Sequence, residues 1–193
     1  MKSWFSLGVL MVCLAGCGTE ARGPYRSTAE QQRDPAKAEA LYHEAKALLD
    51  GKPTAADQVA AEKALREALS FDLYHGPAHN NLGVMLLRQD KLYDAAEEFE
   101  WARKLLPGNP EPRVNLAIAL ERGGKHGDAI EAAKTALEVA PGNLAAMQTI
   151  AYVQVREGMT DSALPGYLTA IVQRGDPAWS GWAKNQQLQR SAE

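Results

Sequence analysis

Residues 76–109 read GPAHNNLGVMLLRQDKLYDAAEEFEWARKLLPGN, and this stretch decides the fold. Laid over the stretches that follow it, 110–143 and 144–177, it matches in column after column. The matching columns hold apolar or small residues: Leu82, Leu116 and Ile150; Gly83, Ala117 and Ala151; Ala95, Ala129 and Ala163; Phe99, Ala133 and Tyr167; Ala102, Ala136 and Ala170. Such a repeat is typical of a solenoid, in which each helix pair buries its apolar face against its neighbours.

The repeated residues resemble the tetratricopeptide signature, which combines a Leu-Gly pair, an Ala-x-x-x-Phe element and a terminal proline. The copy at 76–109 contains all three elements: Leu82-Gly83, Ala95-x-x-x-Phe99 and Pro107. The departures are His79, Arg113 and Met147 at the usual tryptophan, Gln154 at an aromatic position and Gly175 at the last proline. The resemblance implies an all-α fold, a right-handed superhelical solenoid of antiparallel helix pairs with a C-terminal capping helix.

The repeat also sets the segment boundaries. Four expected helix starts pair a capping residue with a proline: Asp34-Pro35, Gly76-Pro77, Asn109-Pro110 and Asp176-Pro177. The step from Asp34 to Gly76 is longer than the step from Gly76 to Asn109, so the first helix pair carries a loop insertion, and the phase of its first helix stays open. The predicted segments are a signal peptide at 1–16, a lipid anchor and flexible tether at 17–34, a degenerate helix pair at 35–75, tetratricopeptide pairs at 76–109, 110–143 and 144–177, and a capping helix and tail at 178–193.

The N-terminus has the pattern of a secretory signal. Lys2 precedes an apolar run at 4–15, which is shorter than the ~20 residues that a membrane-spanning helix needs. The Leu-Ala-Gly-Cys tetrad at 14–17 resembles the bacterial lipoprotein box. This resemblance implies cleavage before Cys17, lipidation of its sulfur, and a lipid-anchored place in the cell envelope. Because Gly18 follows the cysteine, we expect the outer membrane, facing the periplasm, if the source has two membranes. The alternative is an ordinary secretory signal with a cysteine nearby by chance.

The composition argues against several kinds of chemistry. The chain has 193 residues, 46% hydrophobic and 23% charged, with a net charge of −3 and no polybasic run, so nucleic acid is not an expected partner. Cys13 leaves with the signal, so no disulfide or cysteine metal cage is predicted. His75 and His79 have a metal-like spacing, but a helix start lies between them. The acidic run Glu97, Glu98 and Glu100 is interpreted as a solvated helix face. We therefore predict no catalytic site, metal, cofactor or small-molecule substrate.

In the tetratricopeptide family the first helix of each pair lines a concave groove that binds peptide segments or helices of partner proteins. Carrying the groove positions over to this sequence gives Asn81, Val84, Leu87, Arg88, Asn115, Ile118, Arg122, Thr149, Tyr152, Val155 and Arg156. Two columns stand out, one apolar (Val84, Ile118, Tyr152) and one of arginines (Arg88, Arg122, Arg156). The arginines have a structural alternative, since a cation near a helix C-terminus favours the helix dipole and pairs with neighbouring acids. The lysines of the family's carboxylate clamp are absent, because Asn80, Val114 and Gln148 stand there.

These patterns predict a non-catalytic scaffold or adaptor lipoprotein that holds a partner protein. The alternative is a structural lipoprotein that self-associates through the C-terminal helix bearing Trp179 and Trp182. Those two side chains lie on one helix face, where packing against the last repeat is the other explanation.

Overall fold

The structure, a computed structural model, describes residues 33–159 and 161–192. The predicted signal peptide, Cys17 and nearly all of the predicted tether lie outside the described residues. Within the described ranges all regular elements are helices, which confirms the all-α prediction: α1 (Pro35–Leu48), α2 (Ala55–Phe71), α3 (Gly76–Arg88), α4 (Leu92–Leu105), α5 (Glu111–Arg122), α6 (His126–Val139), α7 (Leu144–Arg156), α8 (Leu164–Arg174) and α9 (Pro177–Ser191). None of the described helices is long and apolar enough to cross a membrane.

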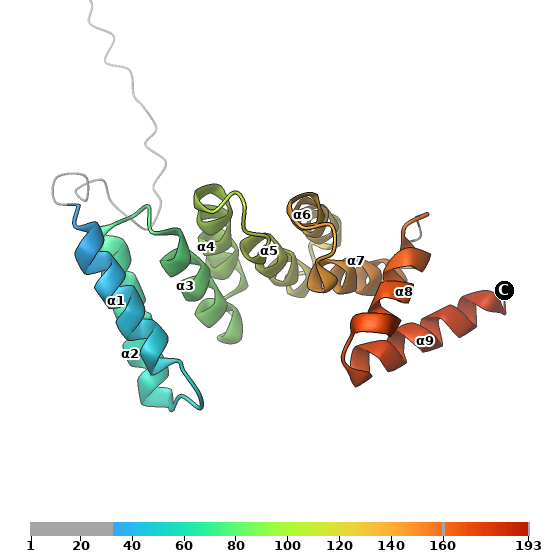
Figure 1. The fold of residues 1–193 in the computed structure, drawn as a ribbon, viewed down its shortest axis with the longest axis horizontal. Helices are drawn as coiled ribbons and strands as arrows, with labels where there is room; N and C mark the ends of the chain where they lie inside the picture. The colour runs from blue at the N-terminus through green and yellow to red at the C-terminus, as the bar shows by residue number, and fades with distance from the viewer. Residues whose placement is uncertain (1–32, 160, 193) are drawn as a thin grey trace, which may run out of the picture.

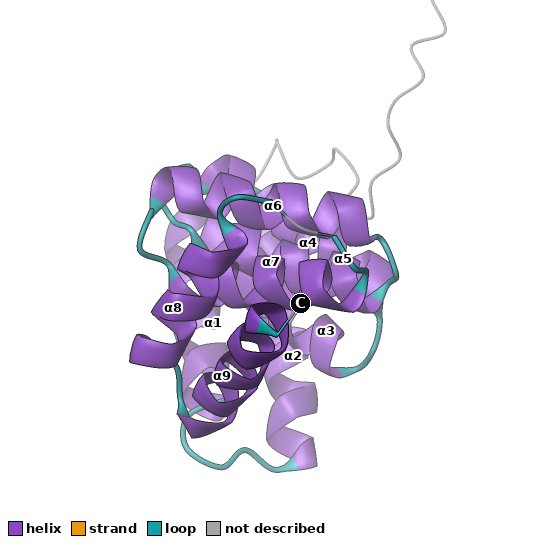
Figure 2. Ribbon diagram, turned by 90° about the vertical axis from the view of Figure 1, so that its right-hand side faces the viewer, coloured by secondary structure: helices purple, strands orange, loops and turns teal. Residues whose placement is uncertain are grey.

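The helices follow one another in a curved row (Figure 1). Each packs on the next along the chain, and α5 also touches α3 and α7, the first helices of the neighbouring pairs. A view turned by 90° shows the described chain as helices joined by loops (Figure 2). This nearest-neighbour packing is what the repeat period predicts for a solenoid. The hand of its superhelical turn stays a prediction.

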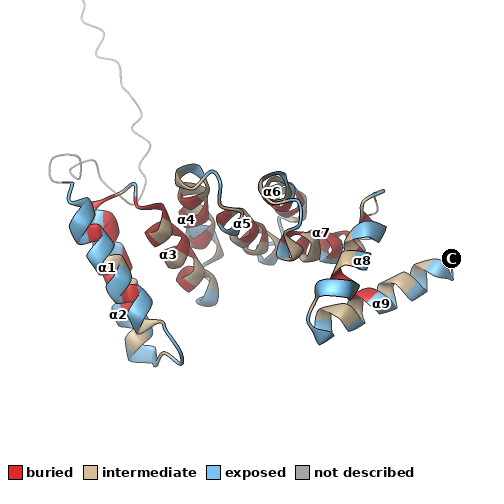
Figure 3. Cartoon of the chain, in the orientation of Figure 1, coloured by how far each residue is buried: buried red, intermediate tan, exposed pale blue. Residues whose placement is uncertain are grey.

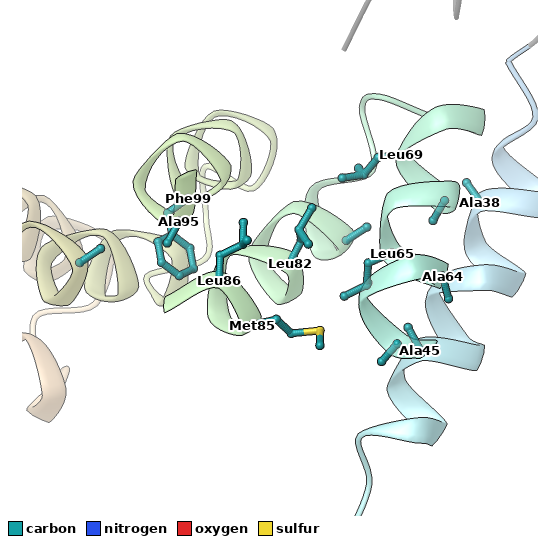
Figure 4. Close-up of a cluster of buried hydrophobic side chains, with 14 of the residues drawn as sticks. Ala38, Ala45, Ala64, Leu65, Leu69, Leu82, Met85, Leu86, Ala95 and Phe99 are labelled. Carbon is teal, nitrogen blue, oxygen red and sulfur yellow. The ribbon is translucent and has the colours of Figure 1, made fainter. Parts of the chain in front are cut away.

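Three successive clusters of apolar side chains form the core, and buried faces point at neighbouring helices along the row (Figure 3). The first cluster joins α1 to α5 and is shown in Figure 4. Leu82 and Phe99 are fully buried in it, as the repeat columns predict, and Leu86 is fully buried beside them. Ala95 and Ala102 are also fully buried, so no large side chain holds the axes of α3 and α4 apart at these positions.

The last repeat departs from the predicted columns. Ala95 and Ala129 lie inside α4 and α6, but the equivalent Ala163 is only half-buried and precedes the first residue of α8. The reason is local. Asp161 accepts hydrogen bonds from the backbone N–H groups of Ala163 and Leu164 at 2.9 and 3.0 Å, so its carboxylate caps the helix at this point.

Two of the four predicted helix starts are corrected by the structure. Asp34 and Asp176 cap α1 and α9 as expected. For α3 the cap is His75, whose Nδ1 accepts from the Ala78 N–H at 3.1 Å, and Gly76 is already helical. A Cβ on Gly76 would come within 2.8 Å of the Leu106 side chain, so close packing explains the glycine better than capping does. For α5 the cap position is Pro110, while the Asn109 side chain accepts the Glu111 N–H at 2.9 Å.

The first two described residues are bonded to the C-terminal end of α2. The Arg33 guanidinium bonds the Asp72 carboxylate at 2.8 Å, and the Asp34 N–H donates to the Phe71 carbonyl at 3.0 Å. Burial would raise the pKa of Asp72, but the hydrogen bonds from Arg33 and from the Tyr74 backbone hold it below its usual value. Arg33 and Asp34, which the sequence prediction placed in the tether, therefore belong to the folded body.

Candidate partner-binding groove

Two hollows open along the first helices of the pairs. One, of about 430 Å³, lies among α5, α7 and α9 and is lined by Ile118, Glu121, Ala145, Gln148, Thr149, Tyr152 and Trp179. The other, of about 460 Å³, lies between α1 and α3 and is lined by His43, Lys46, Ala47, Leu49, Asp50 and Asn81. Asn81 and Thr149 stand in the same repeat column, so both hollows open on the same side of the row. We call these two hollows, with the inward surface of α3 and α5 between them, the inner groove.

An aromatic cluster closes the C-terminal end of the inner groove. The Tyr152 ring lies 6.2 Å from the rings of both Trp179 and Trp182, which are 5.4 Å apart and nearly perpendicular. Edge-to-face pairs at such distances add about 0.5–1.5 kcal/mol beyond the area that they bury. The tryptophans, which the self-association alternative assigned to another molecule, are thus engaged within the chain. Tyr152 keeps 38% of its surface exposed and presents it to the hollow.

The predicted apolar column is less open than the sequence suggested. Val84 and Ile118 are half-buried and pack against the core clusters, and only Tyr152 is exposed. Leu87 and Val155, also predicted for the groove, are half-buried and pack on the core as well. The pattern marks the inward face of each first helix, but neighbouring helices already cover much of it.

Two arginines of the arginine column hold the repeats together. Arg122 donates to the Leu87 carbonyl at 2.9 Å and to Asp90 at 2.7 Å, both in the preceding pair. Arg156 bonds Glu121 of the preceding pair and its own neighbour Glu157, and its hydrogen bond lowers the pKa of Glu157. The structural alternative therefore accounts for these two arginines.

The asparagine column is also partly engaged. Asn115 donates its side-chain N–H to the side-chain oxygen Oδ1 of Asn80 at 3.1 Å, which links α5 to α3. Thr149 lines the hollow among α5, α7 and α9 but is buried, and its hydroxyl donates to the Ala145 carbonyl at 2.9 Å. Asn81 is half-buried and lines the hollow beside α1.

The acidic run on α4 does not form one solvated face. Glu98 is buried, and its Oε2 lies 2.6 Å from Nδ1 of the fully buried His79, whose Nε2 contacts the Leu73 carbonyl at 2.9 Å. Glu97 and Glu100 instead edge a third hollow of about 630 Å³, between α4 and α6, whose rims carry charges of both signs. The lining of that hollow has four carboxylates and three cations, so its charges nearly balance, and the inner groove, which also carries the predicted binding positions, is the better candidate.

The two neighbouring histidines have separate roles. His75 caps α3 through Nδ1, so its Nε2 carries the hydrogen that bonds Glu39 at 2.8 Å, and this bond lowers the pKa of Glu39. No group of three or more His, Cys, Asp or Glu side chains suited to a metal ion occurs in the part of the chain that the structure describes.

Sequence reasoning missed two contributions to the groove. Trp179 lines the hollow from α9, although we expected it to cap the core or to serve self-association, and the first helix pair adds Lys46 and His43. Trp179 stands one repeat length after Ala145, so extending the repeat columns into the capping helix gives the signal that could have placed it. For α1 the phase was open, and no such signal existed.

Comparison with known proteins gives the fold. No protein-family model matches the chain, and no curated protein matches it in sequence. The first TPR of Spaghetti (RPAP3), bound to an HSP90 peptide, matches with a TM-score of 0.60 and 16% identity over 66% of this chain and 98% of that one. MamA (41-end) from Desulfovibrio magneticus RS-1 matches with a TM-score of 0.58 and 19% identity over 80% of this chain and 76% of that one. A mutant O-GlcNAc transferase of Thermobaculum terrenum matches with a TM-score of 0.61 and 22% identity, over 73% of this chain but only 26% of that one. The described chain therefore has the fold of a tetratricopeptide solenoid.

Proposed function

We propose that this chain is a non-catalytic adaptor lipoprotein of the bacterial cell envelope, whose inner groove holds a segment or helix of a partner protein. The observation that carries the proposal is the hollow among α5, α7 and α9, where apolar and aromatic side chains remain accessible at the end of a continuous face. A monomeric solenoid does not need such an opening for its stability, and accessible apolar hollows with a few polar groups are typical of binding sites.

Structural neighbours support a role in holding peptides. The RPAP3 domain is bound to an HSP90 peptide, and it shares this fold over nearly its whole length. A carboxylate clamp of lysines is not proposed for this chain, because Asn80 and Val114 are buried and Gln148 carries no charge. No catalytic role is proposed, because the described side chains of the inner groove do not form an arrangement of nucleophile and base.

Photo-crosslinking in living cells tests the adaptor role. A photoreactive residue at Ala145, which is exposed and lines the hollow, is expected to capture a partner protein. The same residue at Ala60, exposed on α2 outside both hollows, is the matched control and is expected to capture much less. Mass spectrometry of the crosslinked product then identifies the partner and the bound segment. Equal capture at both positions, or none at Ala145, contradicts the adaptor role.

The lipid anchor is tested separately. Cys17→Ser is expected to abolish incorporation of an alkyne-labelled fatty acid and to leave the precursor unprocessed, because the cysteine sulfur is the proposed acceptor. Cys13→Ser, upstream in the same segment, removes the other cysteine and is expected to leave labelling and processing intact. A Cys17→Ser protein that is still labelled to the wild-type level overturns the assignment. Two acyl chains give stable anchoring, so the wild-type protein is expected in the membrane fraction.

A further inference from the structure

The arginine column of the inner groove is uneven. Arg122 and Arg156 are each tied to the preceding helix pair, whereas Arg88 is exposed and forms no hydrogen bond or ion pair with any residue that the structure describes. The cause is the first helix pair. The α1–α2 loop spans residues 49–54, where the α3–α4 loop has only residues 89–91, and its carboxylate, Asp50, is not bonded to Arg88 as Asp90 is to Arg122. Gln89 joins α3 to α2 instead, by donating to Glu62 at 2.8 Å.

A second cation lies at the same end of the groove. Lys46 lines the hollow between α1 and α3, is exposed, and has no ion-pair partner among the described residues. Asp50 is the one carboxylate among the residues that line this hollow, and His43, also in the lining, is engaged by Glu39 at 2.9 Å. Within the hollow Lys46 stands against Asp50, and Arg88 at the C-terminal end of α3 adds a cation that has no ion-pair partner among the described residues, an arrangement that favours an anionic group.

The other end has the opposite character. The hollow among α5, α7 and α9 is walled by Ile118, Tyr152 and Trp179, and its one carboxylate, Glu121, is already bonded by Arg156. Ala145 leaves space on the remaining side. A large aliphatic or aromatic side chain is the group that gains most from burial at such a place.

The distance between the two ends determines how many residues of a bound segment separate its two anchoring groups. Packed helices stand about 8–10 Å apart, so the distance to the space between α5 and α7 is about 12–15 Å from α3 and about 16–20 Å from the hollow between α1 and α3. An extended chain rises about 3.3 Å per residue and covers this distance in about four to six residues. On the basis of the proposed adaptor function, we infer that the inner groove binds an extended partner segment with a carboxylate at the α1–α3 end and a large apolar residue about four to six positions away, at the α5–α7–α9 end.

Selection from a displayed library of random twelve-residue peptides tests this inference on the purified full chain. The wild-type protein is expected to enrich peptides in which Asp or Glu and Leu, Ile, Phe or Trp are about four to six residues apart. One enriched peptide is then synthesised with Asp or with Asn at the acidic position. The Asp form is expected to bind about fivefold more tightly, the upper range for an exposed ion pair. Replacing its apolar residue by alanine is expected to weaken binding tenfold or more.

Variants assign each preference to its end of the groove. Arg88→Gln is expected to remove the discrimination between Asp and Asn while the apolar preference remains. Arg122→Gln is the control from the same column and is expected to keep the discrimination, because its partners are Leu87 and Asp90. Ala145→Trp fills the apolar hollow from an exposed position, so it spares the core and is expected to abolish the apolar preference. Ala60→Trp on α2 is its control.

The outcomes separate this inference from the adaptor role. If no peptides are enriched, if the enriched peptides lack the paired pattern, or if Arg88→Gln still prefers Asp, the inferred segment is wrong. A partner crosslinked at Ala145 in cells would then still support the adaptor role. A crosslinked partner segment that contains the paired residues supports both, whereas failure of crosslinking overturns the adaptor role whatever the library yields.

Discussion

His79→Leu is expected to lower the free energy of unfolding by about 3–5 kcal/mol, the range for removing one partner of a buried pair. Both ring nitrogens of His79 face oxygen acceptors, the Glu98 carboxylate at 2.6 Å and the Leu73 carbonyl at 2.9 Å. Both hydrogen bonds therefore require one proton more than a neutral ring and a carboxylate contain. The pair is neutral as a whole, with this proton on either the ring or the carboxyl group. Loss of His79 leaves the buried Glu98 side chain without its hydrogen-bond partner.

A double variant shows whether the pair itself is the cause. His79→Leu combined with Glu98→Met replaces both partners by apolar side chains of similar volume and is expected to recover most of the loss. The stacking of the His79 ring on Trp101, at 5.5 Å between centroids, is lost in the single and the double variant alike and so cancels in this comparison. Glu100→Gln is the control on the same helix, because it breaks only the half-exposed pair with Arg103 and is expected to cost less than about 1 kcal/mol.

Urea unfolding followed by circular dichroism at neutral pH measures these differences. A His79→Leu protein within about 0.5 kcal/mol of the wild type, or a double variant no more stable than the single one, contradicts the role given to the pair.

Phe99→Ala is expected to cost about 3–5 kcal/mol, because the ring is fully buried between α3 and α4 in the cluster of Figure 4. The ring also explains why Gly83 has no side chain. A Cβ on Gly83 would come within 2.6 Å of the Phe99 ring, which is closer than real Cβ contacts allow. Gly83→Ala alone is thus expected to overpack this contact and to cost about 1–3 kcal/mol, despite the better helix propensity of alanine.

The two positions are expected to be coupled. In Gly83→Ala with Phe99→Leu, the smaller side chain leaves room for the new methyl group, so the double variant should lose less than the sum of the single variants. Gly181→Ala is the matched control in α9, where a Cβ meets nothing within 4 Å, and it is expected to stabilise by up to about 1 kcal/mol. Urea unfolding followed by circular dichroism measures these differences as well. Strictly additive losses in the free energy of unfolding would show that Gly83 and Phe99 do not share this space.

The sequence alone determined the periodic part of this protein. Columns one repeat length apart predicted which side chains are buried, and Leu82 and Phe99 are in the core as those columns required. A solenoid makes this possible, because each pair repeats the same contacts with its neighbours and the period in the sequence is the period in space. Small residues such as Ala95 and Ala102 could be assigned to close helix contacts for the same reason.

The tertiary structure alone decided what each equivalent residue touches. Glu98 looked like its neighbours Glu97 and Glu100, because a run of acids does not reveal which one a buried histidine on the preceding helix will meet. The three arginines occupy equivalent sequence positions, but only Arg88 follows a helix pair with a longer loop. A repeat column identifies equivalent positions, whereas the partner at each position depends on the neighbouring unit and on how the helices cross. For that physical reason the sequence could predict the groove as a surface. Only the packed structure separated Arg88, which is unpaired among the described residues, from Arg122 and Arg156, and only it brought Trp179 into the wall of the groove.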